Sequence, residues 1–317
     1  MIVAVLAACG GGSRPSPVQP TEISDQARAY LNEVLGLMQT HSINRLLIDW
    51  TNFRATIFSQ AGNAQIIAQT YPAIRSAISL LGDGHSSFRD SGGFVISAPG
   101  RACPASSPPT VAVPATIGYV KVPAFSGIGP EAAAFANGLQ RAIRDADERG
   151  VIGWMVDVRG NRGGNMWPMV AGVGPLLGEG VIGYFIDPVG AESAWEYRDG
   201  ASWDNGVVQQ RVDAPYRLKR AGPRVAVLTD AGTVSSGEAT VIAFKGRRDT
   251  RSFGVPTCGL STAIENYPMS DGGMLNLAIS VMADRTRTKY GFAVEPDETL
   301  DAGQVVERAT AWLRTGE

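Results

Sequence analysis

Histidine, cysteine and lysine are scarce in this chain of 317 residues, which holds two histidines, three cysteines and four lysines. The histidines and cysteines are too few and too far apart in sequence to match the spacing of a metal site, and we expect neither a metal nor another cofactor. The 28 lysines and arginines nearly balance the 30 aspartates and glutamates, without a basic run. This charge pattern argues against nucleic acid as a partner.

Long apolar runs are also missing after the N-terminus, so no later segment is expected to cross a bilayer. Residues 2–9 read Ile-Val-Ala-Val-Leu-Ala-Ala-Cys. The end of this run resembles a bacterial lipobox, whose cysteine, here Cys9, is lipidated after cleavage. A buried N-terminal strand is the alternative, but Gly/Ser/Pro-rich sequence follows as far as Pro20. We expect residues 1–20 to be a signal remnant and tether that anchors a lipoprotein in the bacterial cell envelope, facing the periplasm or the exterior.

Two cysteines remain, Cys103 and Cys258. In an oxidising compartment these two cysteines can pair as a disulfide, and two free thiols are the alternative.

Residues 21–92 carry apolar side chains at helical spacing and predict a small helical bundle. The first helix follows Asp25 as the expected cap and presents one apolar face: Ala27, Tyr30, Leu31, Val34, Leu35 and Met38. Further groups begin at Leu46 and Ile66. Residues 93–115 are rich in proline and serine and predict a connector.

Residues 116–317 alternate between strand and helix patterns. Strands are expected at 118–122, 152–158, 181–186, 225–228, 251–254 and 275–282, and helices at 130–148, 166–177, from 235 onward and at 302–313. Such alternation is typical of a sheet covered by helices, so the predicted fold class is α/β.

Ser235 lies in a small-residue turn between an apolar strand and a helix. Unpaired N–H groups and the helix dipole favour negative charge there, as the oxyanion of an acyl-transfer intermediate requires. The alternative is an ordinary N-cap serine.

A serine nucleophile needs a base, and the two histidines differ in setting. His41 ends the first helix, where a cation is favoured by the dipole. His85 lies in a polar loop with no apolar face to fill, and is either the base or an exposed turn residue. Lysine can also serve as base, but Lys245 is ten residues beyond Ser235 on the same helix and too far away.

The loop at residues 159–165 follows a buried strand and precedes a helix. It lacks the sequence of a nucleotide-binding loop and fits either an oxyanion hole built from glycine amides or a plain tight turn.

Five motifs occur in order along the chain. They are Gly82-Asp-Gly-His-Ser86, Asp157-Val-Arg-Gly-Asn-Arg-Gly-Gly164, Thr233-Val-Ser-Ser-Gly-Glu238, Gly254-Val-Pro-Thr-Cys-Gly-Leu-Ser-Thr262 and Gly291-Phe-Ala-Val-Glu-Pro-Asp297. Together they resemble the C-terminal processing (tail-specific) peptidase family, on the branch related to the tricorn core protease. The resemblance implies that the α/β part is a ββα core of the ClpP/crotonase type.

The resemblance also implies site residues. Ser235 matches the nucleophile, with Ser236 as second choice, and His85 matches the base of the tricorn-like branch. Leu260 stands where the lysine branch has its base. The amides of Ser236 and of Gly163 or Gly164 match the oxyanion hole.

Three further residues have supporting roles in this comparison. Glu295 is the positional match to a glutamate that completes the site. Glu238 follows the nucleophile by three residues. The family has a serine before its histidine, whereas here Gly84 precedes His85 and Ser86 follows it. The short connector leaves no room for the PDZ domain that many relatives carry.

The expected function is serine endopeptidase action on peptides or unfolded proteins. A catalytically inactive peptide-binding relative and an esterase-type hydrolase are the alternatives. The residues around Ser235 lack the Gly-x-Ser-x-Gly elbow that is usual in esterases.

Overall fold

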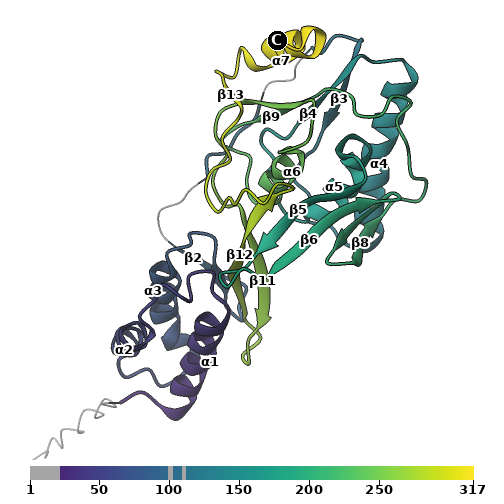
Figure 1. The fold of residues 1–317 in the computed structure, drawn as a ribbon. Coiled ribbons are helices and arrows are strands. Elements are labelled where there is room, and N and C mark those ends of the chain that lie inside the picture. Colours follow the sequence, from purple (N-terminus) through teal and green to yellow (C-terminus); the bar gives the residue numbers. More distant parts are fainter. Residues whose placement is uncertain (1–21, 99–102, 109–111) are drawn as a thin grey trace, which may run out of the picture.

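The computed structural model describes residues 22–98, 103–108 and 112–317. Cys9 and the predicted tether therefore lie outside the described residues. A small helical unit lies at one end of the molecule and a larger α/β core at the other, and a long hairpin reaches from the core into the helical unit (Figure 1).

The helical unit has four helices: α1 (Asp25–His41), α2 (Trp50–Ala61), the short 3-10 helix η1 (Ile67–Thr70) and α3 (Tyr71–Leu81). All six apolar residues predicted for the first helix are buried. The cap is Ser24 and not Asp25, because the Ser24 hydroxyl accepts a hydrogen bond from the Ala27 amide at 3.2 Å. Asp25 instead occupies the first turn.

The helical unit shares its core with a sheet. Strand β1 (Ser87–Arg89) pairs with β12 (Met274–Asp284) of the hairpin and with β2 (Val95–Ser97). Phe88 of β1 and Leu275 of β12 are buried among the helices. The segment predicted as a connector thus contributes a strand, β2, beside the helical unit.

The core contains a five-stranded parallel sheet, in the order β13-β10-β9-β4-β3. Its strands are β3 (Ile117–Lys121), β4 (Gly153–Asp157), β9 (Val225–Thr229), β10 (Thr250–Gly254) and β13 (Glu298–Thr299). Helix α7 (Val305–Thr315) packs on one face. On the other face lie α4 (Gly129–Glu148), α5 (Met166–Leu177) and α6 (Ser236–Phe244).

The second sheet is antiparallel, in the order β2-β1-β12-β5-β6-β7-β8, with β11 on the other side of β12. Besides the strands already given it holds β5 (Gly180–Ile186), β6 (Glu192–Arg198), β7 (Ala201–Asp204), β8 (Val207–Arg211) and β11 (Thr262–Pro268). One apolar core joins both sheets through α5 and α6, since Val227, Met169 and Trp195 belong to the same cluster. Helix α6 therefore packs between the two sheets.

The predicted α/β fold with N-terminal helices is confirmed. The prediction of one helix-covered sheet was too simple, because β6, β7, β8 and β11 belong to a separate antiparallel sheet. No helix among the described residues is long and apolar enough to span a membrane.

Candidate active site

Ser235 occupies the turn between β9 and α6 with an unusual backbone conformation. Its φ is 53° and its ψ is −113°, whereas an ordinary N-cap residue is extended. A positive φ strains a residue with a side chain, and such strain is concentrated at functional sites. Ser235 is thus the N-cap residue of the helix, as the N-cap alternative predicted. Its backbone geometry, however, is that of a serine held at a sharp strand-to-helix turn.

The Glu238 carboxylate fixes this turn from inside the protein. It is fully buried and accepts hydrogen bonds from the Ser235 amide at 2.7 Å and the Leu260 amide at 2.8 Å. The Gly259 amide (2.7 Å) and the Thr257 hydroxyl (2.5 Å) complete four donors. Burial raises the pKa of Glu238, and these hydrogen bonds oppose the rise. The carboxylate thus joins the Ser235 turn to residues 257–260.

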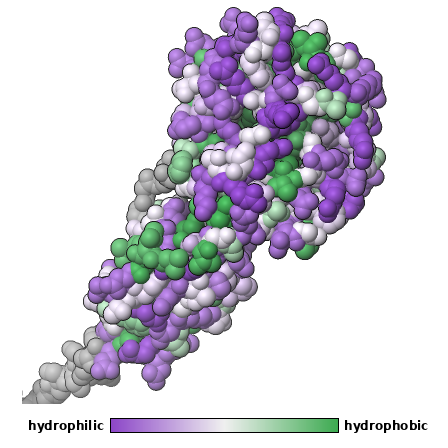
Figure 2. All heavy atoms as spheres, in the orientation of Figure 1, coloured by the Kyte–Doolittle hydropathy of each residue, from purple (hydrophilic) through white to green (hydrophobic). Residues whose placement is uncertain are grey.

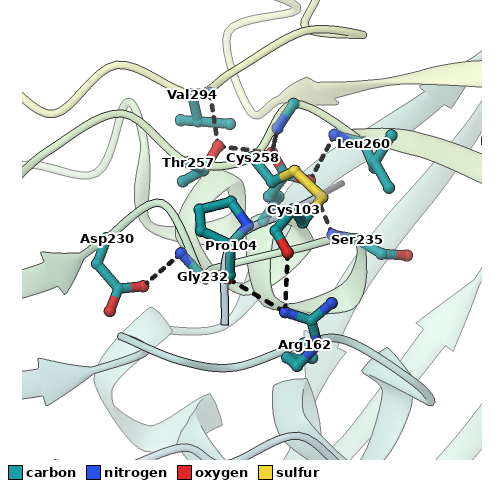
Figure 3. Close-up of a disulfide and its surroundings, with 12 residues drawn as sticks. Cys103, Pro104, Arg162, Asp230, Gly232, Ser235, Thr257, Cys258, Leu260 and Val294 are labelled. Carbon is teal, nitrogen blue, oxygen red and sulfur yellow. Dashed lines mark hydrogen bonds between the residues drawn. A yellow bond between two sulfur atoms is a disulfide. The ribbon is translucent and has the colours of Figure 1, made fainter. Parts of the chain in front are cut away.

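A disulfide holds the same segment from outside (Figure 3). Cys103 and Cys258 are bonded, with their Cα atoms 5.5 Å apart, so the structure has the bridge and not two free thiols. The Cys258 amide also donates to the Thr233 carbonyl at 3.0 Å, and Arg162 donates to the Cys103 carbonyl at 3.3 Å. Cys103 is therefore fixed beside the Ser235 turn.

His85 lies in the loop between α3 and β1. Its Nδ1 atom is 2.7 Å from the hydroxyl of Thr262, the first residue of β11. The Asp83 carboxylate accepts from the His85 amide at 2.8 Å. Burial lowers the pKa of His85 to about 4, and the charge of Asp83 acts in the opposite direction. The imidazole is therefore neutral near pH 7.

Ser86 anchors the His85 loop to the hairpin. Its side chain donates to Asp83 at 2.7 Å and accepts from the Ala278 amide of β12 at 3.0 Å. Ser86 is buried, and Asp83 also accepts from its amide at 2.6 Å. The serine after the histidine thus positions the loop.

Ser235 and Thr262 line one cavity of about 610 Å³. His85 is hydrogen-bonded to Thr262, so it contacts a residue of the cavity that Ser235 lines. The contacts of the described residues include no direct Ser235–His85 hydrogen bond, and catalytic hydrogen bonds are often long before substrate binds. Two residues separated by 150 positions are thus brought to one site from different parts of the fold.

Ser236 and Gly164, two of the three residues predicted for an oxyanion hole, lie together. Both line the cavity, and the Ser236 hydroxyl donates to the Gly164 carbonyl at 2.6 Å. Neither amide has an acceptor among the described residues, whereas the Gly163 amide donates to Asn161 at 2.9 Å. Gly163 instead allows the Ser235 turn to pack closely, because a side chain at this position would place its Cβ only 3.0 Å from the Ser235 Cβ.

Glu295 is not placed to orient His85. It is exposed, its backbone oxygen accepts from Lys245 at 3.0 Å, and no contact joins its carboxylate to His85 among the described residues. Sequence reasoning attached no role to Thr262, which contacts the imidazole instead.

Two of the lysines and the other histidine have partners elsewhere. Lys245 pairs with Asp297 at 2.8 Å and Lys121 with Asp157 at 3.3 Å. His41 stacks on Tyr267, with ring centroids 4.8 Å apart.

The cavity has both apolar and acidic lining residues. Apolar lining includes Trp167, Phe185 and Met282, and acidic lining includes Asp187 and Glu192. A second cavity of about 530 Å³ shares Asp187 and Thr262 and reaches the α1–α2 loop. Hydrophobic surface gathers where the helical unit approaches the core (Figure 2). The two cavities therefore adjoin at Asp187 and Thr262.

Residues 116–300 match the model of peptidase family S41. The chain belongs to this family and is a serine-type peptidase.

Among known proteins, the chain is 27% identical over 268 residues to the nisin-resistance protein of Lactococcus lactis subsp. lactis, covering 84% of this chain and 80% of that protein. Among solved structures, it is similar to a lipoprotein from Streptococcus agalactiae, with a TM-score of 0.72, 19% identity, and coverage of 93% of this chain and 98% of that one. The photosystem II D1 C-terminal processing protease has a TM-score of 0.60 and 17% identity, covering 92% and 98%. These structures share the fold of this chain.

Proposed function

We propose that the protein is a serine endopeptidase that uses Ser235 as nucleophile and His85 as general base. The Ser235 hydroxyl attacks the scissile carbonyl as its proton passes to His85 Nε2. The C–N bond then breaks, the proton passes to the leaving amine, and His85 activates the water that hydrolyses the acyl-enzyme. The amides of Ser236 and Gly164 hold the oxyanion in each intermediate.

One observation carries this proposal: the half-buried His85 contacts Thr262, which lines the same cavity as Ser235, a serine with a strained backbone. Leu260 and the ion pairs of Lys245 and Lys121 support the histidine-dependent, tricorn-like branch over a Ser–Lys mechanism. Because residues 93–115 are too few for a PDZ domain, we propose that substrates bind without such a module.

The substrate we propose is a peptide or an unfolded segment outside the cytoplasm. Both cavities together favour an extended chain over a compact ester. Similarity to a nisin-resistance protein makes nisin the first peptide to test. We also propose that Cys9 is lipidated and anchors the enzyme in the envelope, in keeping with the disulfide, which suits an oxidising compartment. Mass spectrometry of the native N-terminus tests the anchor, and an unmodified Cys9 contradicts it.

The function is tested by peptide hydrolysis and fluorophosphonate labelling of Ser235→Ala beside the matched Ser236→Ala variant. We expect Ser235→Ala to lose both signals and Ser236→Ala to remain labelled. Labelling of Ser235→Ala at the parent level would place the nucleophile elsewhere.

A further inference from the structure

The hydrogen bond between His85 and Thr262 sets which ring nitrogen is available for proton transfer. A neutral imidazole has one N–H and one basic nitrogen, and the partner of one nitrogen decides the role of the other. Thr262 Oγ1 lies 2.7 Å from Nδ1 and is the one hydrogen-bond partner of the ring among the described residues. If Nδ1 donates to this oxygen, Nε2 keeps its lone pair for the Ser235 proton.

Thr262 is held firmly enough to orient a ring. Its side chain is buried, and its backbone pairs with Val281 in the β11–β12 hairpin. The preceding Ser261 accepts from the Gly291 amide at 2.8 Å and donates to the Phe292 carbonyl at 2.6 Å. Leu260, two residues before Thr262, is held by Glu238. The hydroxyl is therefore fixed by the same segment that fixes the nucleophile turn.

The other side of His85 is fixed as well, but through its backbone. Asp83 is the charged group that acts on His85, and its carboxylate is engaged by the His85 amide, the Ser86 amide and the Ser86 hydroxyl. It contacts the loop and not the imidazole nitrogens. Since the Glu295 carboxylate is exposed and makes no contact with the ring, no carboxylate orients the imidazole among the described residues.

We propose that Thr262 is the positioning residue of the general base, so that a neutral hydroxyl takes the place that a carboxylate has in a Ser-His-Asp triad. This inference rests on the proposed function, since it assumes that His85 is the base. The hydroxyl selects the tautomer and the ring orientation. Unlike a carboxylate, it adds no negative charge to stabilise the imidazolium that forms during the reaction.

The kinetic test compares Thr262→Val, which keeps the shape and removes the hydroxyl, with Thr262→Ser, which keeps the hydroxyl. We expect Thr262→Val to lower kcat about tenfold, or about 1.4 kcal/mol in the barrier, with KM little changed. Thr262→Ser should remain within about threefold of the parent, a difference of less than about 1 kcal/mol. Thr310→Val, a buried threonine of α7 on the far face of the parallel sheet, is the matched control and should have parent activity.

A spectroscopic test works even if Thr262→Val does not fold. With only two histidines, ¹⁵N NMR of the imidazoles is simple to assign by comparison with His41→Ala. In the parent protein near pH 7 we expect His85 to carry its proton on Nδ1. A proton on Nε2 would overturn the inference whatever the kinetics show.

The outcomes separate this inference from the proposed function. A fully active His85→Ala variant would show that His85 is not the base, and would contradict the proposed function itself. An inactive His85→Ala beside a fully active Thr262→Val would overturn the role of Thr262 alone. A Thr262→Ser variant as impaired as Thr262→Val would likewise show that the hydroxyl is not what the site requires.

Discussion

Replacing Glu238 with glutamine tests whether the buried carboxylate holds the Ser235 turn. In the parent, one carboxylate oxygen accepts from Ser235 and Leu260 and the other from Thr257 and Gly259. A glutamine can offer its oxygen to one of these pairs only. Its NH₂ group then faces the other pair, and two buried donors lose their acceptor.

The expected cost follows from those two donors. A buried donor left unsatisfied costs about 1–3 kcal/mol, so Glu238→Gln should lose about 2–6 kcal/mol of unfolding free energy. Domains are stable by about 5–15 kcal/mol, so this variant should still fold in many conditions. An alanine would leave four donors without an acceptor, and it is therefore the less informative change.

Urea unfolding and peptide hydrolysis are the two assays. We expect a lower unfolding midpoint and a reduced kcat, because the Ser235 amide loses the contact that holds its strained backbone. Glu307→Gln is the matched control, since Glu307 is also a first-turn helix glutamate but is exposed, and its substitution should stay within about 0.5 kcal/mol. A Glu238→Gln protein within 1 kcal/mol of the parent and with parent kcat would refute the reasoning.

Four further predictions concern the base, the pH dependence of stability and the disulfide. Burial lowers the pKa of His85 to about 4, so kcat/KM should fall as pH drops through about 4, and an acid limb near 6.5 would contradict this. Because the folded-state pKa lies below the unfolded value, the unfolding free energy should also decrease from about pH 6.5 down to about 4. Joint Cys103→Ser and Cys258→Ser replacement should lower the unfolding free energy by up to about 5 kcal/mol, measured by urea unfolding, because the bridge spans 155 positions. Lys289→Ala should keep parent peptidase activity while His85→Ala loses most of it, and the reverse pattern would make a lysine the base.

Helices and buried parallel strands were predictable because their patterns are local. The apolar face of α1 and the bounds of α5 follow from helical spacing alone. The N-cap residue of α1 could not be predicted in this way. Ser24 and Asp25 are both good N-cap residues, and the backbone conformation that leads into the helix decides between them. Strand β11 is half exposed and owes its existence to pairing with β12, which no local pattern encodes.

The site divides in the same way. His85 and Ser235 stood out because histidine is rare and the serine turn is distinctive. The contact of Thr262 with His85 could not be predicted, since a threonine at the start of a strand is common and 177 positions separate the two residues. Positional matching suggested Glu295 but could not say where its side chain points, and it could not show that Asn161 accepts from the Gly163 amide.

The Cys103–Cys258 bond turns the intervening chain into a covalent ring. Ser235 and Gly164 lie within the ring, whereas His85 and Thr262 lie on the two arms that leave it. A single backbone cut anywhere between the two cysteines, for example in the exposed β7–β8 turn, opens the ring without releasing any fragment. Ser235 and the amides of Ser236 and Gly164 therefore stay attached to both arms after such a nick.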